Sequence, residues 1–308
     1  MAENVLPKQS GRGPEGPARP PLVAALDGSA HEAAVLAWAA ACAVRQGVRL
    51  DLVHVVEVGP VLAPYSVLAT EAPWFGEQLE VAERARLDGL AAGLRERHPG
   101  LEVGVRTPVG SPAGVLVHLS ERATVVVGAS THDRLERLVL GSTALAVVAH
   151  GHGTVVVVPE SLPPVEPHRV VVGADGSDAG GRALAHAVDE AASVGGVVTA
   201  VTAWTVEVED GVVVTEPGTD RWSRVEERVG AATRAALAEA GAAHPDVEVA
   251  VVVRNGRPAR AVLDVADEVD ADLVVVGRRG RGGFAGLLMG SVSRTVVQRT
   301  TRPVAVVH

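Results

Sequence analysis

Residues 273–291, LVVVGRRGRGGFAGLLMGS, hold the pattern that predicts the fold of this chain. An apolar run ends in Gly277, Gly280 follows after two intervening residues, and Gly290-Ser291 follows after nine more, which gives the spacing G-x2-G-x9-G-S. Residues 124–142, TVVVGASTHDRLERLVLGS, repeat this layout 149 positions earlier (277 minus 128), with Thr131 where the second glycine is expected. The pattern therefore occurs twice in one chain.

Other landmarks repeat at almost the same offset. Asp27-Gly28-Ser29 matches Asp175-Gly176-Ser177, and Gly110-Ser111-Pro112 matches Gly256-Arg257-Pro258. An offset that changes by only a few residues across so many landmarks indicates two copies of one domain.

The length agrees with this duplication, because 308 residues suffice for two domains of about 100–150 residues each. We predict a flexible tail at 1–19, a first domain at 20–159, a proline-rich linker at 160–167 and a second domain at 168–308.

Short Val-rich runs alternate with helical patterns in both copies, which indicates parallel βαβ units with helices on both faces of a sheet. The predicted strands of the first copy are 22–26, 49–56, 101–107, 124–127 and 154–158. Its predicted helices are 31–46, 77–98, one that begins at Ser111-Pro112, and 142–150. The predicted strands of the second copy are 169–174, 197–204, 248–254, 272–276 and 303–307. The predicted fold class is therefore α/β, with two tandem doubly wound domains.

Composition narrows the class of protein. A net charge of −9 argues against bulk nucleic-acid binding, which requires a basic surface. The longest apolar stretch, 33–44, is shorter than the ~18 residues of a membrane span, so we predict no membrane partner. The single cysteine, Cys42, excludes an intramolecular disulfide and is expected to be a small core residue. We predict a soluble, cytoplasmic protein.

The glycine-rich loop has the properties of an anion site. In doubly wound sheets, ligands bind beyond the carboxyl ends of the strands, and Gly277 follows the fourth strand of its copy. Glycine lets backbone N–H groups approach a bulky anion, and a helix that begins near Ser291 adds donors and partial positive charge. The cluster Arg278, Arg279 and Arg281 either neutralises a phosphate or is a solvated loop. The alternative is that the glycines are only turn residues and Ser291 only a helix cap.

Two common nucleotide motifs are excluded. The chain contains no G-x4-G-K-[ST], so it is not a P-loop NTPase of the usual kind. Gly280-x-Gly282-x-x-Ala285 fits a dinucleotide fingerprint, but it follows the fourth strand of its copy and has no acidic residue about 20 positions further on.

The order of an Asp after strand one, Gly-x-Pro after strand three and G-x2-G-x9-G-[ST] after strand four resembles the universal stress protein superfamily. The layout is that of its tandem members, and the resemblance covers residues 20–308. It implies a five-stranded parallel sheet of the adenine nucleotide α-hydrolase type in each copy, with the fifth strands of the two copies paired. It also implies ATP binding, with Mg²⁺ as an optional companion, and makes a homodimer plausible.

For the second copy, the resemblance implies a complete nucleotide site. Asp175 would lie near the adenine and ribose, Ala203 would take the place of an apolar adenine contact, and Gly256 supplies the Gly-x-Pro element. The predicted phosphate-binding residues are Gly277, Gly280, Gly290, Ser291 and the Val292 backbone, with Arg279 or Arg281 adding charge.

The first copy departs from the pattern. The matching positions that remain are Asp27, Val55, Gly110, Gly128, Gly141 and Ser142. However, the Cβ atom of Thr131 could obstruct the backbone approach, and His132, Asp133 and Glu136 replace the Arg-Gly-rich loop. The acidic groups would repel phosphate, whereas the retained positions favour ATP binding. Both outcomes, ATP binding and its loss, therefore stay open for this copy.

Three functions remain in competition. The first is an ATP-binding regulatory protein of the stress response, with ATP held mainly by the second copy and an unknown protein partner. The second is a slow Mg-dependent ATP hydrolase, for which the sequence shows no second carboxylate at a repeated strand end. The third is a nucleotide-independent dimerisation or interaction module. We favour the first and predict no catalytic residue.

Overall fold

The computed structural model describes residues 19–57, 73–132, 137–160, 166–281 and 288–308. The predicted tail up to residue 18, linker residues 161–165 and loop residues 282–287 lie outside these ranges.

The first copy has five parallel strands in the order β3-β2-β1-β4-β6. The strands are β1 (Leu22–Ala25), β2 (Leu50–Val53), β3 (Val103–Arg106), β4 (Thr124–His132) and β6 (Val155–Pro159). The described helices are α1 (Glu32–Gln46), α3 (Pro73–Arg97), α4 (Pro112–Leu119) and α5 (Ser142–His150). Strand order reverses between β1 and β4, which is where doubly wound sheets bind ligands.

The second copy repeats this topology in the order β11-β8-β7-β12-β13. Its strands are β7 (Arg169–Gly173), β8 (Val197–Trp204), β11 (Glu248–Asn255), β12 (Leu273–Gly277) and β13 (Val304–Val307). Its described helices are α6 (Asp178–Ala192), α7 (Asp220–Ala240), α8 (Pro258–Glu268) and α9 (Ser291–Arg299). The reversal lies between β7 and β12, so the α/β class and the doubly wound topology are confirmed.

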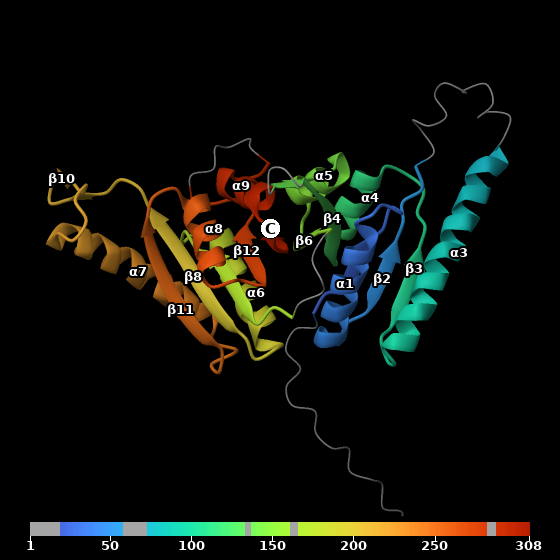
Figure 1. The fold of residues 1–308 in the computed structure, drawn as a ribbon, viewed down its shortest axis with the longest axis horizontal. Coiled ribbons are helices and arrows are strands. Elements are labelled where there is room, and N and C mark those ends of the chain that lie inside the picture. Colours follow the sequence, from blue (N-terminus) through green and yellow to red (C-terminus); the bar gives the residue numbers. More distant parts are fainter. Residues whose placement is uncertain (1–18, 58–72, 133–136, 161–165, 282–287) are drawn as a thin grey trace, which may run out of the picture.

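The fifth strands of the two copies join the sheets into one. β13 pairs with β6 in antiparallel fashion, with Val304 opposite Val157 and Val306 opposite Val155. Figure 1 shows the copies side by side, with the C-terminus between them. The pairing implied by the resemblance is therefore present within a single chain.

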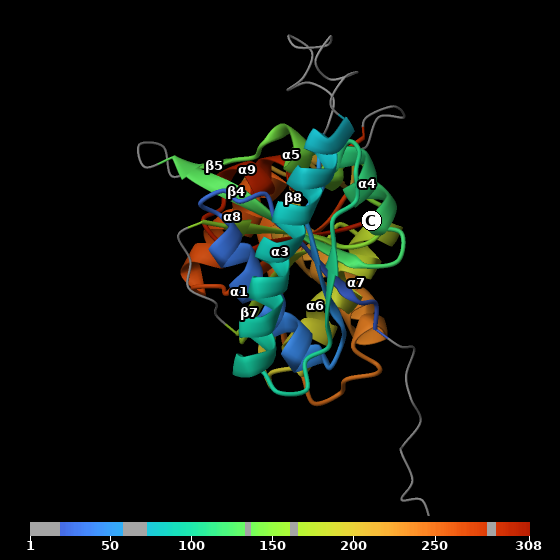
Figure 2. The same ribbon diagram turned by 90° about the vertical axis from the view of Figure 1, so that its right-hand side faces the viewer.

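Helices cover both faces of this continuous sheet, which Figure 2 shows end-on with α3 in front. Alternating strand residues divide between the faces: Leu22 and Ala24 of β1 pack with α1, whereas Val23 belongs to the core under α4 and α5. The first face carries α1, α3, α6 and α7, and the second carries α4, α5, α8 and α9.

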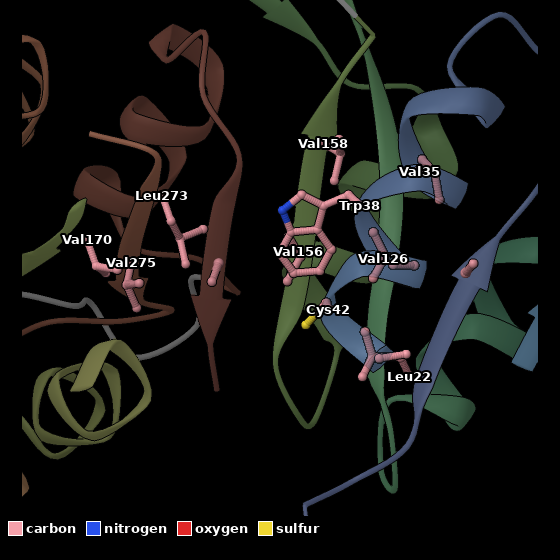
Figure 3. Close-up of a cluster of buried hydrophobic side chains, with 14 of the residues drawn as sticks. Leu22, Val35, Trp38, Cys42, Val126, Val156, Val158, Val170, Leu273 and Val275 are labelled. Atoms are coloured by element: carbon pink, nitrogen blue, oxygen red, sulfur yellow. The ribbon is translucent and has the colours of Figure 1, made fainter. Parts of the chain in front are cut away.

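The core under α1 and α6 runs through both copies without interruption. Trp38 of α1 is buried in the same cluster as Val156 and Val158 of β6, and Leu273 and Val275 of β12 belong to it as well. Figure 3 shows these side chains around the junction. Burial of apolar area therefore stabilises the contact between copies as well as each copy.

The fourth strand of the first copy corrects the sequence prediction. We predicted a strand at 124–127 followed by a loop, but β4 continues to His132 and turns back as β5 (Arg137–Val139), with Ser130 opposite Val139. Thr131 is β-branched and suits extended backbone, whereas the glycine at this position in the second copy does not. Asp133 and Glu136 lie outside the described residues.

A second hairpin was also missed, formed by β9 (Val208–Glu209) and β10 (Val212–Val213) in the segment between β8 and α7. Cys42 is buried, as predicted, and burial raises the pKa of its thiol. Within the described residues, no helix combines the length and the apolar character needed to span a bilayer.

Candidate functional site

The predicted residues of the second copy lie at one edge of the sheet. Asp175 follows β7 and Gly277 ends β12, and these two parallel strands are hydrogen-bonded neighbours on either side of the point where strand order reverses. Ala203 is the penultimate residue of the neighbouring strand β8, where it is half-buried, and Gly256 follows β11. Since all these strands are parallel, their carboxyl ends meet at this edge.

Asp175 organises the start of the glycine-rich loop. Its Oδ1 accepts hydrogen bonds from the Ser177 backbone N–H at 3.0 Å and from the Ser177 hydroxyl at 2.6 Å. Its Oδ2 accepts the Arg281 backbone N–H at 2.8 Å. A carboxylate has about four acceptor positions, so Asp175 can still accept a hydrogen bond from a ligand hydroxyl.

Two glycines make this arrangement possible. A Cβ atom on Gly280 would collide with Oδ2 of Asp175, and a Cβ atom on Gly277 would lie 2.8 Å from the backbone carbonyl of Ala179 in α6. Any side chain at these positions would therefore push the loop away from the strand-end carboxylate or from α6.

Helix α9 begins beside this loop without a side-chain cap. Gly290 is its N-cap residue and has no side chain to cap the helix, and the Gly290 N–H donates to the carbonyl of Arg278 at 2.9 Å. Ser291 is exposed and Val292 half-buried at that turn. The backbone N–H groups of the first turn can therefore bind an anion.

The three arginines of the loop differ in whether their side chains already have hydrogen-bond partners. Arg281 donates to the carbonyl of Gly176 at 3.1 Å, and Arg278 donates to the carbonyl of Ala149 in the first copy at 3.3 Å. Burial, together with the charges of Arg279 and Arg182, lowers the pKa of Arg278. Arg279 is exposed, and within the described part of the chain its side chain makes no hydrogen bond or ion pair. Arg279 is therefore available to a ligand.

The first copy has an open cavity of about 410 Å³ at the matching edge. Five of its six predicted site residues line the cavity: Asp27, Val55, Gly128, Gly141 and Ser142. Gly110 is not among the lining residues; its N–H donates to the carbonyl of Val56 at 3.0 Å, and its positive φ of 154° favours glycine. The volume suits a small molecule.

The polar end of this cavity is acidic. Asp27 accepts the Ser29 N–H at 3.0 Å. Burial alone would raise the pKa of Asp27, but the hydrogen bonds from Ser29 and the electrostatic effect of His31 outweigh burial, so the pKa is lowered. Glu32 also lines the cavity, accepts the Gly28 N–H at 2.8 Å and pairs with Arg86. Among the lining residues that the structure describes, none is Lys or Arg.

The structure also brings together residues that the sequence did not single out. His31, Ser130 and Glu160 meet beside this cavity, although they come from three distant segments. No motif or spacing connects them, so sequence reasoning had no signal to find them. No group of three or more His, Cys, Asp or Glu side chains suited to hold a metal ion occurs within the described ranges.

Comparison with known proteins agrees with the duplicated architecture. A model described as the Universal stress protein family matches residues 19–159 and again residues 167–308. A universal stress protein of Mycolicibacterium smegmatis is 35% identical over 297 residues, which cover 93% of this chain and 96% of that relative. One from Mycobacterium tuberculosis H37Rv is 34% identical over 293 residues, which cover 92% of this chain and 96% of the relative.

Solved structures share the fold over nearly the full length. A universal stress protein from Archaeoglobus fulgidus superposes with a TM-score of 0.62 at 22% identity, covering 94% of this chain and 96% of that one. A putative universal stress protein from Pseudomonas aeruginosa superposes with a TM-score of 0.65 at 16% identity, covering 94% and 93%. The repeated strand-end motifs, the two family matches and these relatives lead to one conclusion: this chain belongs to the universal stress protein family.

Proposed function

We propose that this protein is an ATP-binding regulatory protein of the stress response, with ATP held mainly by the second copy. The observation that carries the proposal is the contact between Gly280 and Asp175, which only a glycine permits. It keeps the backbone of the loop on the strand-end carboxylate, next to the uncapped start of α9.

The charges near the two strand-end sites also favour the second copy as the one that holds ATP. The second-copy loop carries Arg278, Arg279 and Arg281, whereas the described lining of the first-copy cavity holds Asp27 and Glu32 and no Lys or Arg. A triphosphate carries several negative charges. It is therefore attracted to the arginines of the second copy and repelled by the carboxylates of the first copy.

In the proposed complex, each part of the second-copy site holds one part of the nucleotide. Asp175 accepts a hydrogen bond from a ribose hydroxyl, and Ala203 contacts the adenine ring. The phosphates interact with the loop and the helix start: Gly277, Gly280, Gly290, Ser291, the Val292 backbone and Arg279. Mg²⁺ would be held through the phosphates, as this ion commonly is in nucleotide complexes.

The test is calorimetric titration of ATP with Mg²⁺ into the full chain and two glycine variants. Gly280→Asp places a side chain and a second negative charge against Asp175, so we expect at least a tenfold loss of affinity. Gly89→Asp adds the same charge to α3, where a Cβ atom meets nothing within 4 Å, and we expect unchanged affinity.

A third variant, Gly141→Asp, examines the first copy, because it places a negative charge at the start of α5 without a steric contact. We expect it to leave ATP affinity unchanged. Absence of binding by the wild type would overturn the proposal, and loss of affinity in Gly141→Asp alone would move the nucleotide to the first copy. The homodimer, the cytoplasmic location and the protein partner stay predictions.

A further inference from the structure

Three side chains in the first copy form a chain of polar contacts at the cavity. Oγ of Ser130 lies 3.3 Å from Nε2 of His31, and Nδ1 of the same ring lies 3.3 Å from Oε2 of Glu160. Ser130 and His31 both line the cavity of about 410 Å³. This is the order nucleophile, base and carboxylate that activates a serine.

The order of the contacts determines the tautomer of His31. An ionised carboxylate only accepts hydrogen bonds, so Nδ1 carries the proton toward Glu160. In the neutral ring, Nε2 is then an acceptor and faces the hydroxyl of Ser130. His31 is therefore oriented to take a proton from Ser130.

The backbone holds each of the three residues in place. Ser130 lies in β4 opposite Val139 of β5, and the Glu160 N–H donates to the carbonyl of Ala129 at 3.1 Å. His31 precedes α1 and packs over Gly128, where an added Cβ atom would lie 2.7 Å from the Cβ of His31. The His31 side chain is 23% exposed, so it is largely buried but still accessible to a small molecule.

The cavity itself indicates the class of substrate. Apolar side chains form much of its wall, among them Leu26, Val53, Val55, Leu116 and Val127. Its charged lining residues in the described part of the chain are acidic, so an uncharged molecule with an apolar group suits it better than a phosphate. The start of α5 at Ser142 and Thr143 also lines the cavity, with no side-chain cap on its first N–H groups.

We propose that the first copy is an esterase site for small uncharged esters, with Ser130 as nucleophile, His31 as general base and Glu160 as the positioning residue. Ser130 Oγ bonds to the ester carbonyl carbon while its proton passes to Nε2 of His31. The start of α5 stabilises the resulting oxyanion. The carbon–oxygen bond to the alcohol then breaks, and the alcohol leaves with the proton from His31. Water, activated by His31 in turn, hydrolyses the acyl-serine and releases the acid.

The second copy lacks this arrangement. The duplicated pattern places Ala179 at the position of His31 and Arg279 at the position of Ser130. The proposed esterase and the proposed nucleotide site therefore lie in different copies, and each copy lacks the distinguishing side chains of the other.

The first experiment follows hydrolysis of p-nitrophenyl acetate by the full chain. We expect Ser130→Ala and His31→Ala to lower kcat/KM by at least about 100-fold, as loss of a nucleophile or base does. Ser223→Ala and His118→Ala remove an exposed serine and an exposed histidine elsewhere and should leave the rate unchanged. Undiminished hydrolysis in Ser130→Ala would overturn the proposal.

Covalent labelling separates a true nucleophile from surface reactivity. A fluorophosphonate probe should modify Ser130, identified by peptide mass, and the modification should disappear in His31→Ala. No labelling, or labelling confined to another serine, would contradict the assignment. Circular dichroism and urea unfolding of the same variants verify that the chain is folded.

The role of Glu160 requires its own readout. Glu160→Gln should lower kcat with little change in KM and move the pH at which the rate is half-maximal, and Glu160→Asp should restore part of the rate. An unchanged pH profile would leave Glu160 without a positioning role and contradict that part of the proposal. The Gly89→Asp variant should hydrolyse the ester normally. The ester assay needs no nucleotide and the ATP titration needs no ester, so failure of the nucleotide proposal and failure of this one are distinguishable.

Discussion

At the scale of single residues, the two copies differ where their sites differ. Gly128 and Gly277 are retained at matching positions, and each is contacted by the start of the first helix of its copy: His31, which precedes α1, lies against Gly128, and Ala179 of α6 lies against Gly277. Beside this shared contact, Ser130 and Thr131 of the first copy replace Arg279 and Gly280 of the second. The two copies therefore differ at these positions both in backbone, which is extended in the first copy, and in the side chains that follow the shared glycine.

His308 shows a residue-scale effect of burial on charge. Its Nε2 lies 3.1 Å from the carbonyl of Val148, and a carbonyl only accepts, so Nε2 carries the proton. Its Nδ1 is buried and has no hydrogen-bond partner among the residues that the structure describes. Burial and then the charge of Arg278 lower the pKa of His308 to about 4.

This shift predicts a pH dependence of stability. Between about pH 6.5 and 4, the unfolded chain binds a proton at His308 that the folded chain does not, so the free energy of unfolding falls as the pH falls through this window. The contribution is complete above pH 6.5 and amounts to at most about 3 kcal/mol, since the side chain is only partly buried.

Urea unfolding at pH 7 and pH 4.5 measures this contribution. His308→Asn should lose less stability between the two pH values than the wild type, because effects of all other groups are common to both proteins. An equal loss in both would contradict the prediction.

At the scale of elements, the stability of a helix N-terminus depends on whether a side chain caps it. Thr219 caps α7 by accepting the Trp222 N–H at 3.3 Å, and Trp222 packs edge-to-face on Trp204 with ring centroids 4.6 Å apart. Ser111 precedes α4 in a similar extended conformation, but its hydroxyl accepts no cap hydrogen bond, and Pro112 begins the helix.

This difference predicts unequal effects of two similar substitutions. Thr219→Ala should lower the free energy of unfolding by about 1 kcal/mol, because it leaves a helix N–H without its partner. Ser111→Ala should lower it by less than about half of that, because no cap bond is lost. Denaturant titration of both variants checks the order, and an equal or reversed order would contradict it.

At the scale of the whole molecule, a buried polar cluster adds to the strand pair that joins the copies. Glu190 of α6 is 3% exposed and accepts hydrogen bonds from Arg45 and Gln46 of α1, both at 2.6 Å. Arg45 also donates to Ser193 at 2.8 Å. The cluster therefore fixes α1 of one copy against α6 of the other.

Removing one member of this cluster should be costly. Glu190→Ala leaves the Arg45 charge buried without its carboxylate, so we expect a loss of about 3–5 kcal/mol in the free energy of unfolding. The control Glu227→Ala removes the exposed pair with Arg234 and should cost no more than about 1 kcal/mol. Thermal and urea unfolding of both variants measure the difference, and similar losses would contradict the argument.

Much of the architecture was readable from the sequence. The helix at Ser142–His150 and the strand at Val197–Trp204 have the predicted bounds, because apolar period and local caps determine them within a few residues. The sequence also predicted the repeat and the strand-end positions of Asp175 and Gly277, since both follow directly from a strand and its duplicate.

Tertiary structure alone decided the rest. The β4–β5 hairpin depends on pairing between two short segments, and whether Thr131 stands in a loop or a strand is not a local property. His31 meets Ser130 across 99 positions and Glu160 across 129, and only the order of parallel strands brings these three side chains together. Local patterns determine elements because their interactions are local, whereas a site made of distant side chains exists only after the sheet has been assembled.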